Sequence, residues 1–233
     1  MPITETCYAC TRKPTGVEHV PPKAFFPERK DLPAGFDLRH QLITVPSCNR
    51  HNVAKAGDDE YLLFVIATSF ETNPVAQHHY STKLRRAILR RPAIKGLFQG
   101  LRHILVNGVP SGAYDVDAPR ARRSLVLMGR AIFFHQFRKR WKGRLTVLAP
   151  SFLRLRAAAS PEYAAGLAKA EATSLKMFQN EERFGANPQV FLYQVHEGRS
   201  QVTTVLRIVF YGRFSCYVYR QSAAASRRTL SDA

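Results

Sequence analysis

The sequence has no apolar run long enough to cross a membrane, and its first residues give no export signal. No stretch approaches the roughly 20 consecutive apolar residues of a transmembrane helix. The N-terminus lacks the basic and then apolar pattern of a secretory signal peptide. These absences predict a cytoplasmic protein without a membrane partner.

The motifs of several common enzyme classes are missing too. There is no glycine-rich phosphate-binding loop, no Gly-x-Ser-x-Gly turn and no dinucleotide-binding fingerprint. The absence of these motifs argues against nucleotide-dependent enzymes and serine hydrolases of the common types. Any catalytic function has to come from other combinations of residues.

Acidic residues are few beside the basic ones. The chain has 17 Asp and Glu against 35 Lys and Arg, which gives a net charge of +18 at pH 7. Because neutralising phosphates with such side chains releases counterions, the excess favours nucleic acid as the partner. A charge that serves solubility or attracts anionic lipid is the alternative. The sequence does not indicate an oligomeric state.

Length and composition predict two regions of unequal size. At 233 residues, 45% of them hydrophobic, the chain can bury a substantial core. Residues 1–66 are rich in proline, cysteine and charge, which is typical of a small module held by a metal. Residues 67–222 predict a basic helical accessory region with a β-rich C-terminal part, and residues 223–233 a disordered tail. The predicted fold class is α+β.

The N-terminal module is expected to contain two strands and a helix. Residues 16–22 favour a short strand that prolines interrupt, and residues 42–45 favour a second strand. A helix is expected to begin near Asn52 and to be buried over residues 58–67, where apolar side chains lie on most faces.

The accessory region changes from helical to β-rich along the chain. Helical periodicity is expected from about residue 74 to 143 and again from 160 to 183. Residues 190–195 and 203–219 are rich in strand-forming residues, with a turn at 211–214. They predict a C-terminal antiparallel hairpin or small sheet.

Three of the four cysteines fall in two short pairs with the same spacing. Cys7-x2-Cys10 and Cys48-x2-His51 supply three thiolates and one imidazole, a complete tetrahedral set for structural zinc. Two chance pairs in a loop-rich region are the alternative. We predict a zinc that holds the fold and takes no part in catalysis. Cys216 is expected to be a buried, inert thiol.

A second group of residues suggests hydrolytic chemistry. His19 would take the proton from an attacking water, and Glu18 would hold a hard divalent cation such as Mg²⁺. Neighbours on an extended strand point to opposite sides, although a bend before Pro21 would bring both to one cleft. An exposed acid beside a strand histidine is the alternative. Asn52 offers an amide oxygen as a second cation ligand, or else caps the helix.

Nearby charged side chains complete the candidate site. The candidate phosphate contacts are Lys23, Arg50 and Lys55, and Lys55 is alternatively a solvated helix residue. The acids at residues 58–60 are expected to support the helix or to pair with the basic helices, rather than to complete the cation site.

With these residues, the N-terminal quarter resembles the HNH endonuclease family, the ββα-metal nucleases, in its zinc-containing bacterial branch. The similarity spans residues 7 to 61 and lies in four segments. These are Cys-x2-Cys, Glu-His-Val-Pro-Pro-Lys at 18 to 23, Leu-Ile-Thr-Val-Pro-Ser-Cys at 42 to 48, and Asn-x5-Asp-Asp-Glu-Tyr at 52 to 61. The resemblance implies an HNH fold, with His19 as general base and with Glu18 and Asn52 as ligands of the catalytic cation.

The sequence departs from the family pattern at three places. His51 stands where the second knuckle usually ends in cysteine, a change that zinc accepts. The middle asparagine of the motif would fall near Ile43, so its bracing hydrogen bond must come from elsewhere. Asn52 stands in for the last histidine.

The resemblance predicts divalent-metal-dependent hydrolysis of phosphodiester bonds in nucleic acid, with DNA as the expected substrate. One alternative is a catalytically inactive, zinc-stapled nucleic-acid-binding protein, because the middle asparagine is missing. Another is an RNA-directed nuclease or toxin, which would use the same residues.

Overall fold

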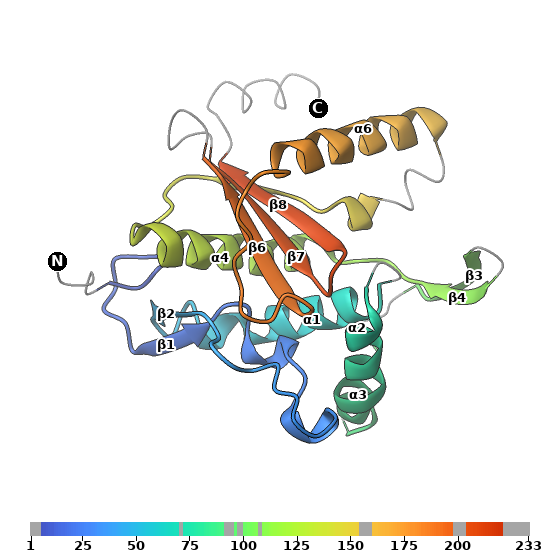
Figure 1. Ribbon diagram of the computed structural model, residues 1–233, viewed down its shortest axis with the longest axis horizontal. Coiled ribbons are helices and arrows are strands. Elements are labelled where there is room, and N and C mark those ends of the chain that lie inside the picture. Colours follow the sequence, from blue (N-terminus) through green and yellow to red (C-terminus); the bar gives the residue numbers. More distant parts are fainter. Residues whose placement is uncertain are drawn as a thin grey trace.

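The computed structural model describes residues 6–69, 72–90, 96, 100–106, 109–153, 160–197 and 204–220. A long central helix, α4 (Ala118–Phe137), separates the N-terminal elements from a C-terminal antiparallel sheet (Figure 1). The fold is mixed helix and sheet, as the residue patterns predict.

Two short antiparallel strands open the chain. β1 (Gly16–His19) pairs with β2 (Thr44–Ser47), with Glu18 opposite Val45. β1 ends before two prolines, which have no amide hydrogen to donate to the ladder. Two 3-10 turns, η1 (Lys23–Phe25) and η2 (Arg29–Asp31), lie in the segment between the strands.

A helix follows the second strand, as expected. The chain leaves β2 through the 3-10 turn η3 (Val53–Lys55) and enters α1 (Ala56–Ala67). Residues 61–67 are all buried, which agrees with the apolar residues on most faces of this segment. α1 packs against α4, and Asp58 on α1 forms ion pairs with Arg120 at 2.9 Å and Arg123 at 3.0 Å. The expected pairing of the acids with a basic helix is therefore confirmed for Asp58.

The next segment corrects the prediction of continuous helix over residues 74–143. α2 (Pro74–His79), the π-helical turn η4 (Tyr80–Leu84) and α3 (Arg85–Arg90) are helical. β3 (Arg102–Val106) and β4 (Val109–Ala113) then form an antiparallel hairpin. Leu97 and Leu101 have helical spacing, but Gly100 adopts a φ of +65°, a conformation that glycine tolerates and a helix does not contain.

The C-terminal sheet has four antiparallel strands in the order β5-β8-β7-β6. They are β5 (Leu145–Leu148), β6 (Phe191–His196), β7 (Val205–Phe210) and β8 (Phe214–Arg220). A tight turn at Tyr211 and Gly212, both with positive φ, joins β7 to β8. The predicted C-terminal hairpin is confirmed, and the sheet extends it by β5 and β6. The predicted tail at 223–233 lies outside the described residues.

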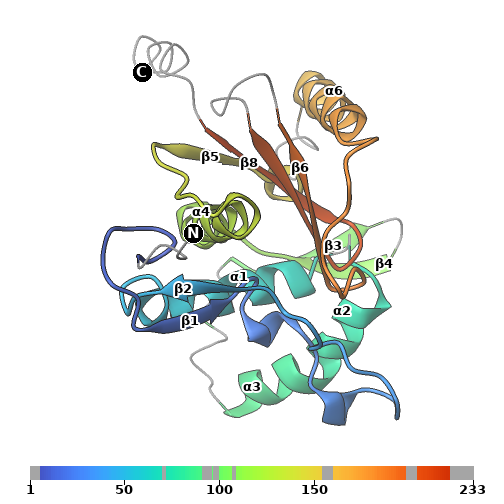
Figure 2. The same cartoon turned by 60° about the vertical axis from the view of Figure 1, so that its left-hand side comes forward.

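One further helix covers the sheet. α6 (Pro161–Met177) lies on the side of the sheet away from α4 (Figure 2). It begins at the expected proline, and the Ser160 side chain accepts a hydrogen bond from the Tyr163 amide as a cap. A short 3-10 turn, η6 (Pro150–Leu153), follows β5. No helix in the described part of the chain combines the length and the apolar character needed to cross a bilayer.

Buried contacts connect the N-terminal elements to the sheet. Tyr211, in the turn after β7, donates a hydrogen bond to the Phe25 carbonyl at 2.5 Å, and its oxygen lies 2.9 Å from Nδ1 of His79. All three residues are buried. The predicted boundary at residue 66 lies near the end of α1, and the hydrophobic cluster contains residues from both sides of it.

Candidate functional site

Four metal-ligating side chains converge at the corner between the strands and the helix. The Sγ atoms of Cys7, Cys10 and Cys48 and a ring nitrogen of His51 all lie within 4.8 Å of one another. Two segments about forty residues apart meet here, because the Tyr8 amide donates to the Pro46 carbonyl at 2.9 Å. The two pairs identified in the sequence, Cys7 with Cys10 and Cys48 with His51, therefore form one cluster.

The spacing of these atoms fits a tetrahedral zinc ion. Bonds of about 2.3 Å to sulfur and about 2.0 Å to nitrogen place two sulfurs about 3.8 Å apart, and a sulfur and a nitrogen about 3.5 Å apart. The Sγ atoms of Cys10 and Cys48 are 3.8 Å apart. Nδ1 of His51 lies 3.5 Å from Sγ of Cys7 and 3.4 Å from Sγ of Cys48. The cluster could hold a metal such as zinc with all four positions filled by protein.

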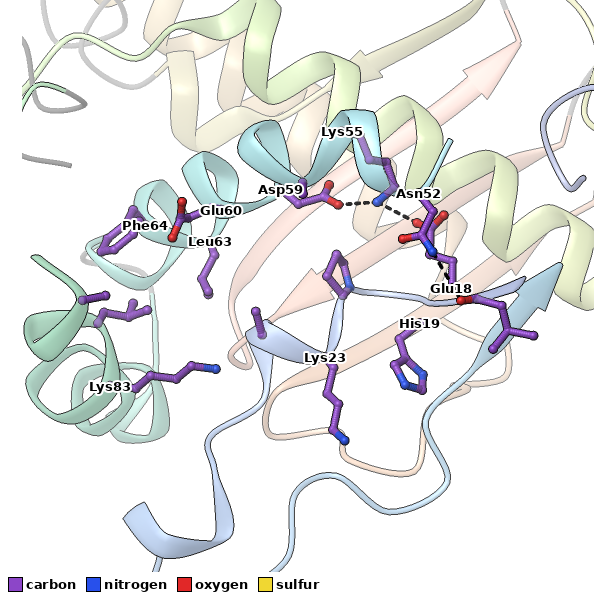
Figure 3. A pocket seen from close by; sticks show the side chains of 16 residues that line it. Glu18, His19, Lys23, Asn52, Lys55, Asp59, Glu60, Leu63, Phe64 and Lys83 are labelled. Carbon is purple, nitrogen blue, oxygen red and sulfur yellow. Dashed lines mark hydrogen bonds and ion pairs between the residues drawn. The ribbon is translucent and has the colours of Figure 1, made fainter. Parts of the chain in front are cut away.

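A pocket of about 370 Å³ opens beside this cluster, between β1, η1, α1 and the helical turn η4 (Figure 3). It begins one residue after the last cluster member, because Asn52 follows His51. The polar residues that line it are Glu18, His19, Lys23, Asn52, Lys55, Asp59, Glu60 and Lys83. The structure therefore brings the predicted Glu18, His19 and Asn52 to one pocket, together with Lys23.

His19 is the candidate base, and its surroundings favour the neutral ring. Burial and the nearby Lys23 ammonium lower the pKa of His19, and the Ile43 carbonyl acts in the opposite direction. The ring atom Nδ1 is buried and makes no hydrogen bond of normal geometry to any described residue. Ile43 is the position of the middle asparagine in the HNH pattern that the sequence resembles. Its backbone is thus the group that faces the ring there.

Glu18 is buried in a charge cluster rather than open to the pocket alone. Its Oε1 lies 2.6 Å from Nζ of Lys55, and its Oε2 accepts a hydrogen bond from Ser47 at 3.2 Å. Nζ of Lys55 also binds Asp59, which accepts a hydrogen bond from Ser124 of α4. Burial raises the pKa of both Glu18 and Asp59, while the Lys55 ammonium acts to lower it.

Lys55 has a different place from the one predicted. The side chain is only 5% exposed and lies between two carboxylates (Figure 3). It is therefore not a solvated helix residue, and its ammonium is not free to contact a phosphate. A cation enclosed by two acids satisfies charges that would be costly to bury alone.

Asn52 keeps its amide oxygen uncommitted. Its Nδ2 donates to the Val17 carbonyl at 3.4 Å, and it makes no side-chain cap at the start of η3. The capping alternative is therefore wrong. No described residue donates to Oδ1, which leaves this hard oxygen free for a ligand.

The remaining predicted contacts lie at the surface. Lys23 and Arg50 are exposed, and Lys23 lines the pocket beside His19. Arg50 is not among the lining residues. The His19 ring points away from the Glu18 carboxylate, which faces Lys55 (Figure 3). The acid and the base thus occupy different parts of the pocket wall.

Three side chains that contact Glu18, Lys55 or each other in the buried charge cluster were not predicted as parts of the site: Ser47, Asp59 and Ser124. Lys55 and Asp59 are four residues apart, a spacing at which opposite charges meet on a helix, so this pair had a sequence signal. Ser124 lies 65 residues from Asp59, and only the packing of α4 on α1 brings them together. No local pattern could have indicated that contact.

Replacing Lys55 by methionine tests the buried ion pairs. Lys55→Met leaves two acids buried together without a counter-charge, so we expect the free energy of unfolding to fall by about 3–5 kcal/mol. Urea unfolding measures the loss. The matched control is Lys23→Met, an exposed lysine on the same pocket, which should change stability by less than about 0.5 kcal/mol. Equal stability of the two variants would remove the structural role of Lys55.

Comparisons with known proteins give no family. No protein-family model matches the chain, and neither the curated proteins nor the solved structures give a match. The function therefore has to be argued from the geometry of the site.

Proposed function

We propose that this protein is a divalent-metal-dependent nuclease of the HNH type, with a structural zinc at the Cys7, Cys10, Cys48 and His51 cluster. One observation carries the proposal. A half-buried histidine with a lowered pKa shares a pocket with a carboxylate and an uncommitted amide oxygen, on a strand-strand-helix unit joined at a Cys3His cluster.

His19 acts as the general base. Its lowered pKa keeps the ring neutral near pH 7, so that it accepts a proton from an attacking water. Lys23 is exposed beside it on the same pocket and attracts the phosphate as a point charge. The base and a cationic contact thus stand together at the open part of the pocket.

The donors at the other part of the pocket suit a hard divalent cation. Mg²⁺ binds one or two protein oxygens and keeps several waters. Oδ1 of Asn52 is free. The Glu18 carboxylate has about four acceptor sites and three protein partners, Lys55, Ser47 and Tyr8, which leaves a lone pair for a ligand. When all three groups are ionised, Glu18, Asp59 and Lys55 carry a net charge of −1, because two acids share one ammonium. A bound cation would neutralise charge that develops on the phosphate.

Lys55 positions Glu18 within this arrangement. Its ammonium holds Oε1 of the acid, while Ser47 holds Oε2. The carboxylate is therefore fixed by β2 and by η3 at the start of α1. A fixed ligand loses little freedom when a cation binds, which favours a defined geometry.

A second candidate function is supported by the same contacts. Glu18 already has a cation, Lys55, at 2.6 Å, so an added divalent ion must share the acid with it. If sharing is not achieved, the protein is a zinc-stapled nucleic-acid-binding protein without catalysis. Such a protein would bind with a steep dependence on salt and without any need for magnesium.

Cleavage assays with and without added metal test the proposal. Fluorescent duplex DNA, the corresponding single strand and RNA of the same sequence are incubated with the zinc-loaded protein. We expect cleavage with Mg²⁺ or Mn²⁺ and none without added metal. The nucleic acid that is cut distinguishes a DNA nuclease from an RNA-directed one. Binding without cleavage under every metal would favour the second candidate function.

A further inference from the structure

A second cavity, of about 530 Å³, opens at the C-terminal end of α4. It is built from that helix end, the connection to β5 and the last residue of β8. We call it the basic cavity, and its lining residues are Thr6, Phe133, Phe134, Arg138, Lys139, Arg140, Trp141, Lys142 and Arg220. Five of these nine residues are cationic and none is acidic.

The backbone around the basic cavity is held in place by the protein. Arg130 on α4 donates to the carbonyl of Trp141 and, at 2.8 Å, to that of Gly143. Gly143 has a φ of +92°, and a Cβ placed there would lie 2.9 Å from Nε of Arg220. The Arg220 guanidinium therefore packs against this connection. Arg220 is an exposed residue, so its cation also meets solvent.

The positive charge of the basic cavity is not neutralised within the described chain. No ion pair joins a described carboxylate to Arg138, Lys139, Arg140, Lys142 or Arg220. Cations gathered in a concave surface with low-dielectric walls produce a focused positive potential. Such a surface attracts an anion of matching size or a chain of anions.

The apolar residues favour nucleic acid over a membrane as the source of those anions. Proteins that bind at a membrane surface insert exposed aromatic or aliphatic side chains. Here Phe133, Phe134 and Trp141 are at most 5% exposed, and the Phe133 and Trp141 rings stack at 4.7 Å. The aromatic lining residues are buried, whereas Arg138, Lys139, Lys142 and Arg220 are exposed.

The basic cavity and the His19 pocket are each lined by a residue that is next in sequence to a member of the Cys3His cluster. Thr6 lines the basic cavity and precedes Cys7, whereas Asn52 lines the His19 pocket and follows His51. We propose that the basic cavity binds the phosphate backbone of a nucleic acid beyond the bond at His19. The identity of the polyanion rests on the proposed function, but the binding does not depend on cleavage.

A charge-removal variant tests this inference by binding alone. Affinity of a fluorescent duplex is measured by anisotropy over a range of salt, without added divalent metal. The variant Lys139→Gln/Arg140→Gln/Lys142→Gln is expected to bind about tenfold more weakly. Its slope of log affinity against log salt should be lower by about 2 to 3, since each lost phosphate contact removes about 0.9.

A matched variant controls for total charge. Lys169→Gln/Lys176→Gln/Arg183→Gln removes the same charge from exposed positions on or just after α6. It is expected to weaken binding by less than about twofold. A single variant, Arg138→Asn, removes one charge at a residue whose φ of +54° asparagine tolerates, and should lower the slope by about 1. Equal effects of the two triple variants would overturn the inference.

Two further measurements distinguish a nucleic acid from a lipid surface and from a small free anion. If the first triple variant loses affinity for phosphatidylserine vesicles and not for DNA, the cavity is a membrane site and the inference fails. If inorganic phosphate competes as well per phosphate as the duplex does, the cavity binds a free anion and the inference also fails. A protein that never cleaves but shows the expected loss of DNA affinity would refute the proposed function and support the inference.

Discussion

Cys48→Ala is expected to abolish zinc binding and to unfold the N-terminal module. Removing one of four ligands leaves an incomplete tetrahedral site, and apparent zinc binding energies in small zinc modules are about 10–16 kcal/mol. The segment before β1 and the corner after β2 meet at this cluster. Metal analysis should give about one zinc per chain for the wild type and none for the variant. Loss of helix signal and rapid proteolysis before α1 should accompany the loss of zinc.

Two matched substitutions sharpen this expected result. Cys216→Ala removes a buried thiol that lies outside the cluster, so the variant should keep its zinc. Asn52→Ala changes the residue beside His51 without touching a zinc ligand, so it should stay folded and lose metal-dependent activity. A Cys48→Ala variant that is folded at wild-type stability would show that the cluster does not hold the module together. Unfolding of Asn52→Ala would contradict the assignment of Cys48 to structure and of Asn52 to catalysis.

His19→Ala should lower the cleavage rate by about 10²- to 10⁴-fold, the usual contribution of a general base. The stability should change little, because the ring is only half-buried. The rate is measured with saturating duplex and Mg²⁺, and the melting temperature of each variant is measured in the same buffer. Added imidazole is expected to restore part of the lost rate, since it supplies the missing base.

His103→Ala is the control for this variant. His103 is an exposed histidine on β3 and does not line the His19 pocket. Its replacement should leave the rate unchanged. If His19→Ala and His103→Ala cleave equally well, His19 is not the base. If His19→Ala fails to bind the duplex instead of failing to cleave it, the histidine is a substrate contact.

The two expected results depend on different parts of one short segment. Cys48 and His51 belong to the Cys3His cluster, whereas Asn52 lines the pocket and donates its amide to the Val17 carbonyl. The cluster therefore fixes the corner between strand and helix, and the corner places Asn52 opposite β1. Loss of the metal should remove both the structure of the corner and the metal-dependent activity, whereas loss of the Asn52 side chain should remove only the activity.

Features with a local pattern were predictable from the sequence. The two pairs with equal spacing predicted the Cys3His cluster, because metal ligation constrains residue type and short spacing directly. Strand-forming residues around the turn at Tyr211 and Gly212 predicted the β7-β8 hairpin. The Glu18-His19 step and Asn52 were found as candidates in the same way.

The tertiary structure alone decided what these residues contact. Lys55 was predicted to contact phosphate or to be a solvated helix residue, yet it is buried. The reason is that β1 brings Glu18 to it and α4 brings Ser124 to its partner Asp59. The basic cavity combines Thr6, a helix end and Arg220, which lie far apart in the chain. Long-range packing determines which charged side chains are enclosed and which face solvent, and the spacing of residues along the chain does not indicate which. The sequence thus determined the candidate metal ligands and the candidate base, while the fold decided which lysines and arginines are enclosed and which face solvent.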